Sequence, residues 1–149
     1  MAQASTLPFS ALKIMLESTT TPGTFVAPCG LTSRGLTFSK ETNDTTTPDC
    51  EDEDAASWVE RDVVSKSVSI SVEGVAARES LPRWRAAFED DNPTLARVEV
   101  SGTAAQGGGY WSGLFHLTET NPAVERGQRA TLSCEMQSTG SVLWTPAAA

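Results

Sequence analysis

Four segments of the chain alternate clearly between apolar and polar side chains. They span residues 12–17, 65–73, 96–100 and 130–137. In the second of them, Val68, Ile70 and Val72 alternate with serine and glutamate residues. A period of two is typical of strands that bury one face and leave the other face outside the core. Residues 36–39 and 114–118 follow a weaker form of the pattern, and we also expect strands there.

One segment has the spacing of a helix. Leu81, Trp84 and Phe88 recur on one helical face, Ser80 is expected to cap the N-terminus, and Pro82 suits the first turn. An aspartate-rich sequence that ends in proline is expected to stop this helix. We expect Trp84 and Phe88 to pack in the core against a sheet.

Turn signals separate these elements. Glycine, proline and asparagine cluster between the strands, for example at residues 21–23, 106–109 and 126–128. Many short antiparallel strands with a single helix predict a mainly β fold, a β-sandwich or barrel of antiparallel strands with one flanking α-helix. The length suits a single domain over residues 1–149.

A long polar segment at about residues 41–58 interrupts the strand pattern. It has too few apolar residues to fold by itself. Loops of this length without secondary structure are usually functional or disordered. Trp58 stands at its exit, which is an unusual place for a large aromatic side chain.

The same segment is rich in acidic residues, which raises the question of a calcium loop. With Asp49 at the first position, Glu60 falls at the twelfth, as in an EF-hand. However, Asp54 stands where that loop requires glycine for its sharp turn, and a strand follows instead of a second helix. We therefore expect neither a calcium site nor any other cofactor.

Charge and cysteine content narrow the classes of function. The net charge of −8 and the sequence pI of about 4.6 oppose tight binding to nucleic acid, although a protein that lets a polyanion pass would fit. Three widely spaced cysteines and one histidine fit neither a disulfide framework nor a zinc site.

No apolar run approaches the ~20 residues of a membrane span. The N-terminal segment lacks the pattern of a secretory signal, so we expect the protein to be made and kept in the cytosol.

No catalytic group of residues emerges. The spacing around Ser112 is off by one from a nucleophile elbow, and His116 has no serine or cysteine placed beside it. The glycines at 107–109 lack the helix and lysine of a phosphate loop. A hydrolase stays open as an alternative, but the sequence pairs no carboxylates for it. We expect the protein not to be an enzyme.

The polar sides of the strands admit several interpretations. Ser67, Ser69, Ser71 and Glu73 alternate with the apolar residues of their strand. Such a face is typical of a solvated surface, but a subunit contact or an acid-leaning channel wall would have the same pattern. The alternation does not choose among the three.

The order of the elements resembles a known family. It runs from the strand ALKIMLE through the turn TPGTF, the strand LTSRGLTFSKET and the long polar loop to the strand SKSVSISVEG, the helix LPRWRAAFED and a closing hairpin. Over nearly the whole chain, this layout is similar to that of the major tail (tail tube) proteins of long-tailed phages and of phage-derived gene transfer agents. The resemblance is strongest in the closing hairpin, GYWSGLFHLTETNPAVERGQRATLSCEMQSTGSV.

The resemblance implies a structural protein of a virion tail, assembled in the host bacterial cytoplasm. Such subunits form hexameric rings that stack into a hollow tube, and their inner sheets line its lumen. The implied partners are further copies of the chain, tail terminator, baseplate or distal tail proteins and a tape-measure protein. Double-stranded DNA is expected to pass through the lumen without specific binding, and no membrane is implied.

The resemblance also implies roles for individual residues. The long loop would order against the next ring, and its inter-ring residues would be Asp49, Glu51, Asp52, Glu53, Asp54 and Trp58. The residues expected to face the lumen are Ser67, Ser69, Ser71, Glu73, Glu99 and Glu135.

The main alternative is a monomeric β-sandwich binding module that recognises carbohydrate or a host surface. Tyr110, Trp111 and Trp144 would then be stacking platforms for the ligand. The competing interpretation of these aromatic residues is packing in the core or at a sheet edge, because large aromatic side chains bury readily.

Overall fold

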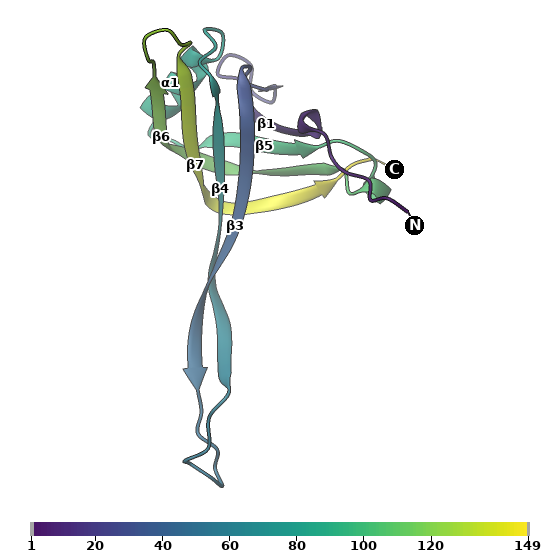
Figure 1. The fold of residues 1–149 in the computed structure, drawn as a ribbon, viewed down its shortest axis with the longest axis vertical. Coiled ribbons are helices and arrows are strands. Elements are labelled where there is room, and N and C mark those ends of the chain that lie inside the picture. The colour runs from purple at the N-terminus through teal and green to yellow at the C-terminus, as the bar shows by residue number, and fades with distance from the viewer. Residues whose placement is uncertain (1, 149) are drawn as a thin grey trace.

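The computed structural model describes residues 2–148 and contains one sheet of seven strands (Figure 1). All neighbouring strands are antiparallel, in the order β2-β1-β5-β6-β7-β4-β3. Short 3₁₀ turns lie at Phe9–Ala11 and Ala104–Gln106. The elements are β1 (Leu12–Glu17), β2 (Phe25–Val26), β3 (Leu31–Thr46), β4 (Val59–Val75), α1 (Leu81–Glu89), β5 (Thr94–Val100), β6 (Gly109–Ala123) and β7 (Thr131–Pro146).

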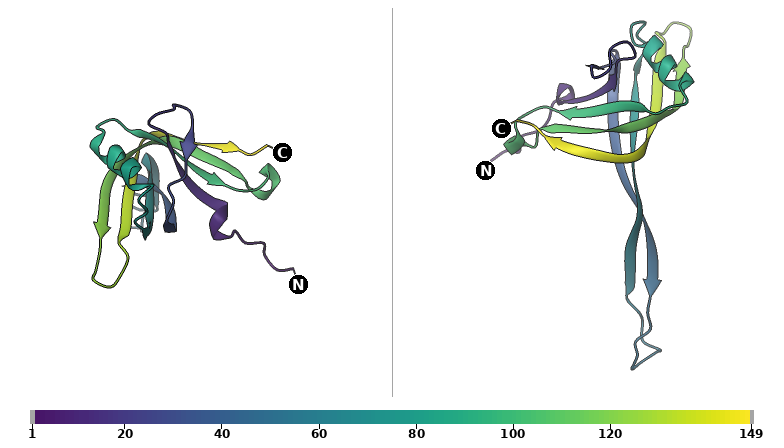
Figure 2. Two further views of the ribbon diagram at one scale, coloured as in Figure 1. Left: turned by 90° about the horizontal axis from the view of Figure 1, so that it is seen from above. Right: turned by 180° about the vertical axis from the view of Figure 1, so that it is seen from behind.

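The sheet folds back on itself because strands β6 and β7 bend (Figure 2). The first half of β6 pairs with β5, whereas the first half of β7 pairs with β4 (Figure 2). Gly140 lies at the bend of β7 with φ of 82°, a conformation that glycine adopts without strain. At the open side, Arg34 of β3 donates a hydrogen bond to the carbonyl oxygen of Leu12 in β1 at 2.5 Å. The predicted mainly β fold of antiparallel strands with one flanking helix is confirmed, and its two layers are halves of one sheet.

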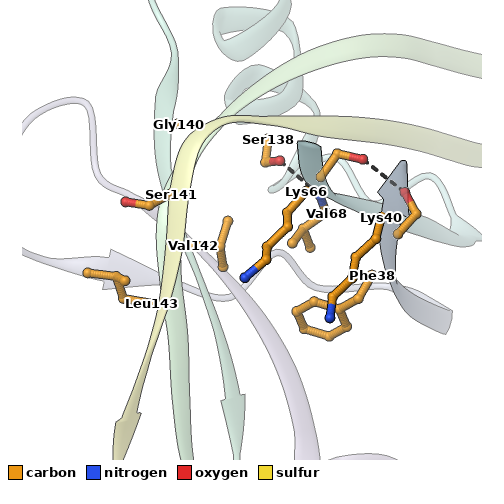
Figure 3. A pocket seen from close by; sticks show the side chains of 11 residues that line it. Phe38, Lys40, Lys66, Val68, Ser138, Gly140, Ser141, Val142 and Leu143 are labelled. Atoms are coloured by element: carbon orange, nitrogen blue, oxygen red, sulfur yellow. Dashed lines mark hydrogen bonds between the residues drawn. The ribbon is translucent and has the colours of Figure 1, made fainter. Parts of the chain in front are cut away.

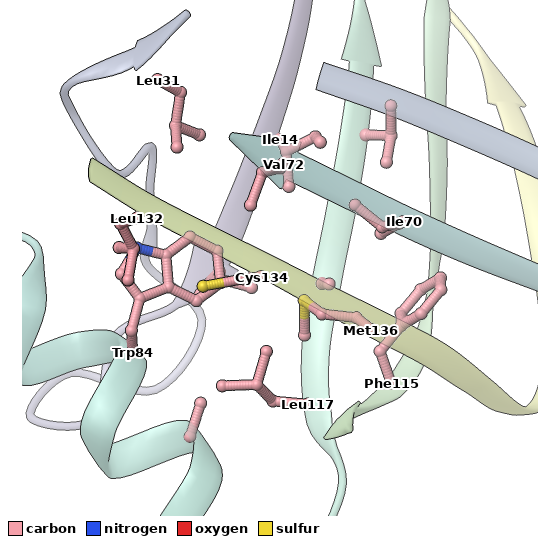
Figure 4. Close-up of a cluster of buried hydrophobic side chains, with 14 of the residues drawn as sticks. Ile14, Leu31, Ile70, Val72, Trp84, Phe115, Leu117, Leu132, Cys134 and Met136 are labelled. Carbon is pink, nitrogen blue, oxygen red and sulfur yellow. The ribbon is translucent and has the colours of Figure 1, made fainter. Parts of the chain in front are cut away.

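A single hydrophobic core fills the space between the two halves (Figure 4). It is built mainly from the alternating positions that the sequence pattern identifies, with Trp84 and Ala87 added by the helix. Burial of a large apolar side chain contributes roughly 1.5–3 kcal/mol. The most completely buried side chains are Trp84, Phe115, Ile14, Leu16, Ile70, Met136 and Val98.

Helix α1 covers the end of the core beside β6 (Figures 1 and 4). Trp84 is 1% exposed, as predicted, and Ala87 is also buried. Arg83 ties the helix to β1, because its Nε and Nη2 donate hydrogen bonds to the carbonyl oxygen of Glu17 at 3.1 and 2.8 Å. Burial lowers the pKa of the Arg83 guanidinium from its ordinary value, but an arginine side chain stays charged near neutral pH.

Two expectations for this helix were wrong. Phe88 is 54% exposed, because it lies at the rim of the helix face, where it borders an open groove between α1 and Pro122 of β6 and Leu132 of β7. Ser80 makes no capping hydrogen bond to the helix. Instead its hydroxyl donates to the carbonyl oxygens of Cys29 and Ala77 at 3.3 and 3.2 Å, which joins the start of the helix to the segment before β3.

Candidate assembly surface

A two-stranded arm projects from the body and is the most unusual feature of the molecule (Figure 1). It is the outer part of the β3–β4 hairpin, whose pairing continues from Lys40 opposite Lys66 to Thr46 opposite Val59. Side chains on both faces of the arm are exposed. A two-stranded hairpin without further support is only marginally stable in water. The arm is therefore weakly supported by its own subunit.

The arm changes the expected extent of the polar loop. Residues 41–46 form the end of β3 and are not loop, so only residues 47–58 connect the two strands. Residues 41–46 form a strand although their sequence is polar. Neither face of this part of the strand meets the core, so the strand forms without alternating apolar residues. Cross-strand hydrogen bonds and the exposed ion pair between Arg61 and Asp44, 3.1 Å apart, hold it instead.

The tip of the arm holds all six residues predicted for the inter-ring loop. Aspartate side chains hold the turns of its backbone. The Asp49 carboxylate accepts a hydrogen bond from the backbone amide of Glu51 at 2.9 Å, and the Asp52 carboxylate accepts one from the backbone amide of Asp54 at 3.3 Å. Trp58 is 91% exposed. Within residues 2–148, no group of three histidine, cysteine, aspartate or glutamate side chains is arranged to hold a metal ion.

Five of the six residues predicted to face the lumen lie together on one polar face. Ser67, Ser69, Ser71 and Glu73 follow one side of β4, opposite to the buried residues of that strand. Glu135 of β7 pairs directly with Ser71 and joins them. The sixth, Glu99, lies on the other half of the bent sheet, where it pairs with Lys13 and Tyr110.

Sequence reasoning missed one acidic residue of this face. Glu119 of β6 is exposed and lies directly opposite Glu135. A bulge at Thr118 shifts the register there, so that Leu117 and Glu119 face opposite sides although they are two residues apart. Period-two counting along β6 therefore assigns Glu119 to the wrong side. The two carboxylates add to the acidic character of the face.

The aromatic side chains of the alternative binding-module hypothesis pack on one another. Trp111 and Trp144 are a cross-strand pair with ring centroids 4.5 Å apart, and Phe38 lies 5.3 Å from Trp111. The Tyr110 ring is covered by the guanidinium of Arg97 at 4.1 Å. These contacts match packing of the aromatic side chains on one another, although Trp144 stays 39% exposed.

Comparison with known proteins agrees with this architecture. The sequence profile of a family described as phage tail tube protein matches residues 9–143. Among curated proteins, none matches the chain significantly. The one helix of residues 2–148 is too short and too polar to cross a membrane.

Three solved structures have the same fold. A chain in the tail of an empty gene transfer agent particle with C6 symmetry is 25% identical, with a TM-score of 0.77 over 94% of this chain and 99% of that one. A chain in the virion of a native gene transfer agent particle is 23% identical, with a TM-score of 0.73 and the same coverage. The SPP1 tail tube protein is 10% identical, with a TM-score of 0.67 over 97% of this chain and 81% of that one. The chain belongs to the phage tail tube protein family and is a structural component of phage or gene transfer agent tails, not an enzyme.

Proposed function

We propose that this chain is the repeating subunit of a tail tube. Six copies would form a ring, and the rings would stack into a hollow conduit for DNA delivery. The observation that carries this proposal is the similarity to a chain in a sixfold-symmetric gene transfer agent tail, which extends over nearly the full length of both chains. Self-assembly of identical subunits by repeated contacts is the simplest way for a small domain to build a long tube.

The arm supplies the contact between rings in this proposal. Its tip presents the acidic residues and Trp58 to solvent, far from the core of its own subunit (Figure 1). Burying a large aromatic side chain on a neighbour would favour assembly, since such side chains dominate interface energetics. Ordering a weakly supported arm at that moment costs free energy, which would restrain premature polymerisation.

The polar face of β4 and β7 is proposed to line the lumen. Serine hydroxyls and the carboxylates of Glu73, Glu119 and Glu135 give it a neutral-to-acidic surface. Within about a Debye length, ~8 Å at physiological salt, such charges repel a phosphate backbone. DNA would then slide along the wall without being held. We also propose that Glu99 faces the lumen, from the other half of the bent sheet.

A tube of this kind has two ends and an interior, and each needs a partner. We propose that a terminator protein caps one end, that baseplate or distal tail proteins hold the other, and that a tape-measure protein occupies the lumen before DNA does.

The monomeric binding module is the second candidate function. No observation favours it, because the aromatic side chains proposed as its platforms pack on one another.

Negative-stain electron microscopy of the purified protein across a concentration series tests the proposal. Sixfold rings or hollow tubes are expected, with their number rising steeply with concentration. Purified tail ends should also be added as seeds, so that a failure to form tubes cannot be due to a missing initiator. Particles that sediment as monomers at every concentration, with and without seeds, would contradict the proposal and favour the binding module.

A further inference from the structure

An apolar groove of about 680 Å³ opens at the root of the arm (Figure 3). Its floor includes Phe38, Val68, Val142 and Leu143, of which Phe38 is 53% and Leu143 63% exposed. The groove is formed where two neighbouring strands separate. The pairing of β4 with β7 ends at Ser69 and Gln137, after which β4 continues into the arm and β7 bends at Gly140 toward β6. The core face thus continues outward beyond the core without a covering element.

Two cations stand at the mouth of this groove. Lys40 and Lys66 lie directly opposite each other on β3 and β4, on the same face as Phe38 and Val68 (Figure 3). Like charges directly opposite in a sheet are destabilising. Within residues 2–148 the single ion pair is that of Arg61 with Asp44, so neither lysine has an acidic partner. The chain has three lysines in total, and two of them are placed here.

A suitable occupant has acidic groups to meet the lysines and a large apolar side chain for the floor. Residues 47–58 have both. They carry Asp49, Glu51, Asp52, Glu53 and Asp54 with no basic residue, and they end in the exposed Trp58. The tip cannot fill the groove of its own subunit, because continuous strand pairing holds tip and groove at opposite ends of the arm. The occupant must come from a second copy.

We infer that the acidic tip of one subunit docks into the Lys40–Lys66 groove of another, with Trp58 on the apolar floor. This inference rests on the proposed function, because it requires that copies of the chain assemble with one another. Tip and groove are different surfaces of one chain, so their contact is heterologous. A subunit whose groove is occupied still has a free tip, so the contact can repeat head to tail, as a stack of rings requires. From Lys40 to Thr46 the arm spans roughly 20 Å at ~3.3 Å per residue, which carries the tip well away from the body of its own subunit (Figure 1).

A charge swap tests the inference. The groove variant is Lys40→Glu with Lys66→Glu, and the tip variant is Asp52→Lys with Glu53→Lys. Each variant alone should raise the concentration needed for tube formation at least tenfold, and the two sets combined in one chain should restore it. A control with the same change in net charge is Arg78→Glu with Arg85→Glu, on the exposed surface around α1, and it should assemble as the unmodified chain does.

Several outcomes would overturn the docking. They are normal assembly of the groove variant, a combined variant no better than either part, and an equal loss in the α1 control. Normal tubes from the groove variant together with weaker DNA binding would assign the lysines to nucleic acid instead. Melting curves check that every variant is folded, which is expected because the changed side chains lie outside the core.

Cross-linking separates this contact from assembly in general. One chain keeps Cys50 in its tip, and a second carries Cys50→Ser and Ser141→Cys in the groove, both with Cys29→Ser. In mixed tubes a short bismaleimide should join the two chains as a heterodimer, and Val124→Cys in place of Ser141→Cys should give none. Tubes without the heterodimer would overturn the docking alone, whereas failure of the unmodified chain to assemble, even on seeds, would overturn both proposals.

Discussion

Glu119 and Glu135 lie directly opposite each other on strands β6 and β7, on the exposed face of the sheet. Like charges in this position disfavour the folded sheet, and neither forms an ion pair with another described residue. Their placement depends on the bulge at Thr118, which turns Glu119 to the same side as Glu135. A surface that keeps two unpaired carboxylates side by side suits a wall that repels a polyanion.

Reversing charge on this face should make the tube hold DNA. For Glu119→Lys with Glu135→Lys, we expect tubes that retain double-stranded DNA at low salt and release it as salt rises, because lysine contacts to phosphate are salt-dependent. Co-sedimentation of DNA with preformed tubes measures the effect. Glu79→Lys with Glu89→Lys, around α1, is the charge-matched control. Retention no greater than in this control, or a tube structure with these side chains pointing outward, would refute the assignment.

Deleting residues 46–54 should abolish tubes and leave the domain folded. The deletion removes the acidic tip but no core side chain, so the free energy of unfolding should change by less than about 1 kcal/mol. Thermal melts and electron microscopy of one preparation give both readouts. Replacing the same residues with glycine and serine at equal length separates the effect of sequence from that of length. Tubes of normal length from the deletion would disprove the role of the tip.

Neighbouring residues of β4 should differ sharply in their effect on stability. Ile70 is fully buried, so Ile70→Ala should cost about 2–5 kcal/mol of unfolding free energy through lost burial and the cavity left behind. Ser71 faces the other side, and Ser71→Ala should change stability by less than about 0.5 kcal/mol. Urea unfolding of both variants checks the prediction. Similar losses in the two would mean that the faces of β4 are assigned wrongly.

Two of the three cysteine thiols should react quickly with an alkylating reagent, and the third should react slowly. Cys29 and Cys50 are exposed, whereas Cys134 is buried. Burial raises the pKa of the Cys134 thiol, and a hydrogen bond with Thr120 at 3.3 Å opposes that rise only in part. The thiolate is the reactive form, so Cys134 should label slowly at neutral pH and quickly once the protein is unfolded. Mass spectrometry after brief alkylation counts the labels, and rapid labelling of all three sites in the folded protein would contradict the burial.

The same pKa predicts a dependence of stability on pH. A thiol whose pKa is higher in the folded state than in the unfolded state contributes stability that is fully present below the unfolded value. That contribution is lost as the pH rises through the folded value. Unfolding midpoints of the unmodified protein and of Cys134→Ala should therefore converge at alkaline pH. A gap between them that stays constant or widens on the alkaline side would contradict the prediction.

The amino-acid sequence by itself determined the strands of the body and most of the core. Val68, Ile70 and Val72 alternate with polar residues, and only one arrangement of a strand buries such a set on one face. Trp84 likewise follows from helical spacing. The sequence also carried the layout of the family and the acidic composition of the segment that became the tip.

Tertiary structure decided what local pattern does not encode. Residues 41–46 form a strand because β4 pairs with them, not because of their own alternation. Phe88 has the spacing of a core residue but lies at the rim of the helix face and stays 54% exposed, and Glu119 changes face at a bulge. The groove beneath Lys40 and Lys66 exists only because β7 bends away from β4. Each depends on contacts between residues distant in sequence, whose free energy no single segment contains.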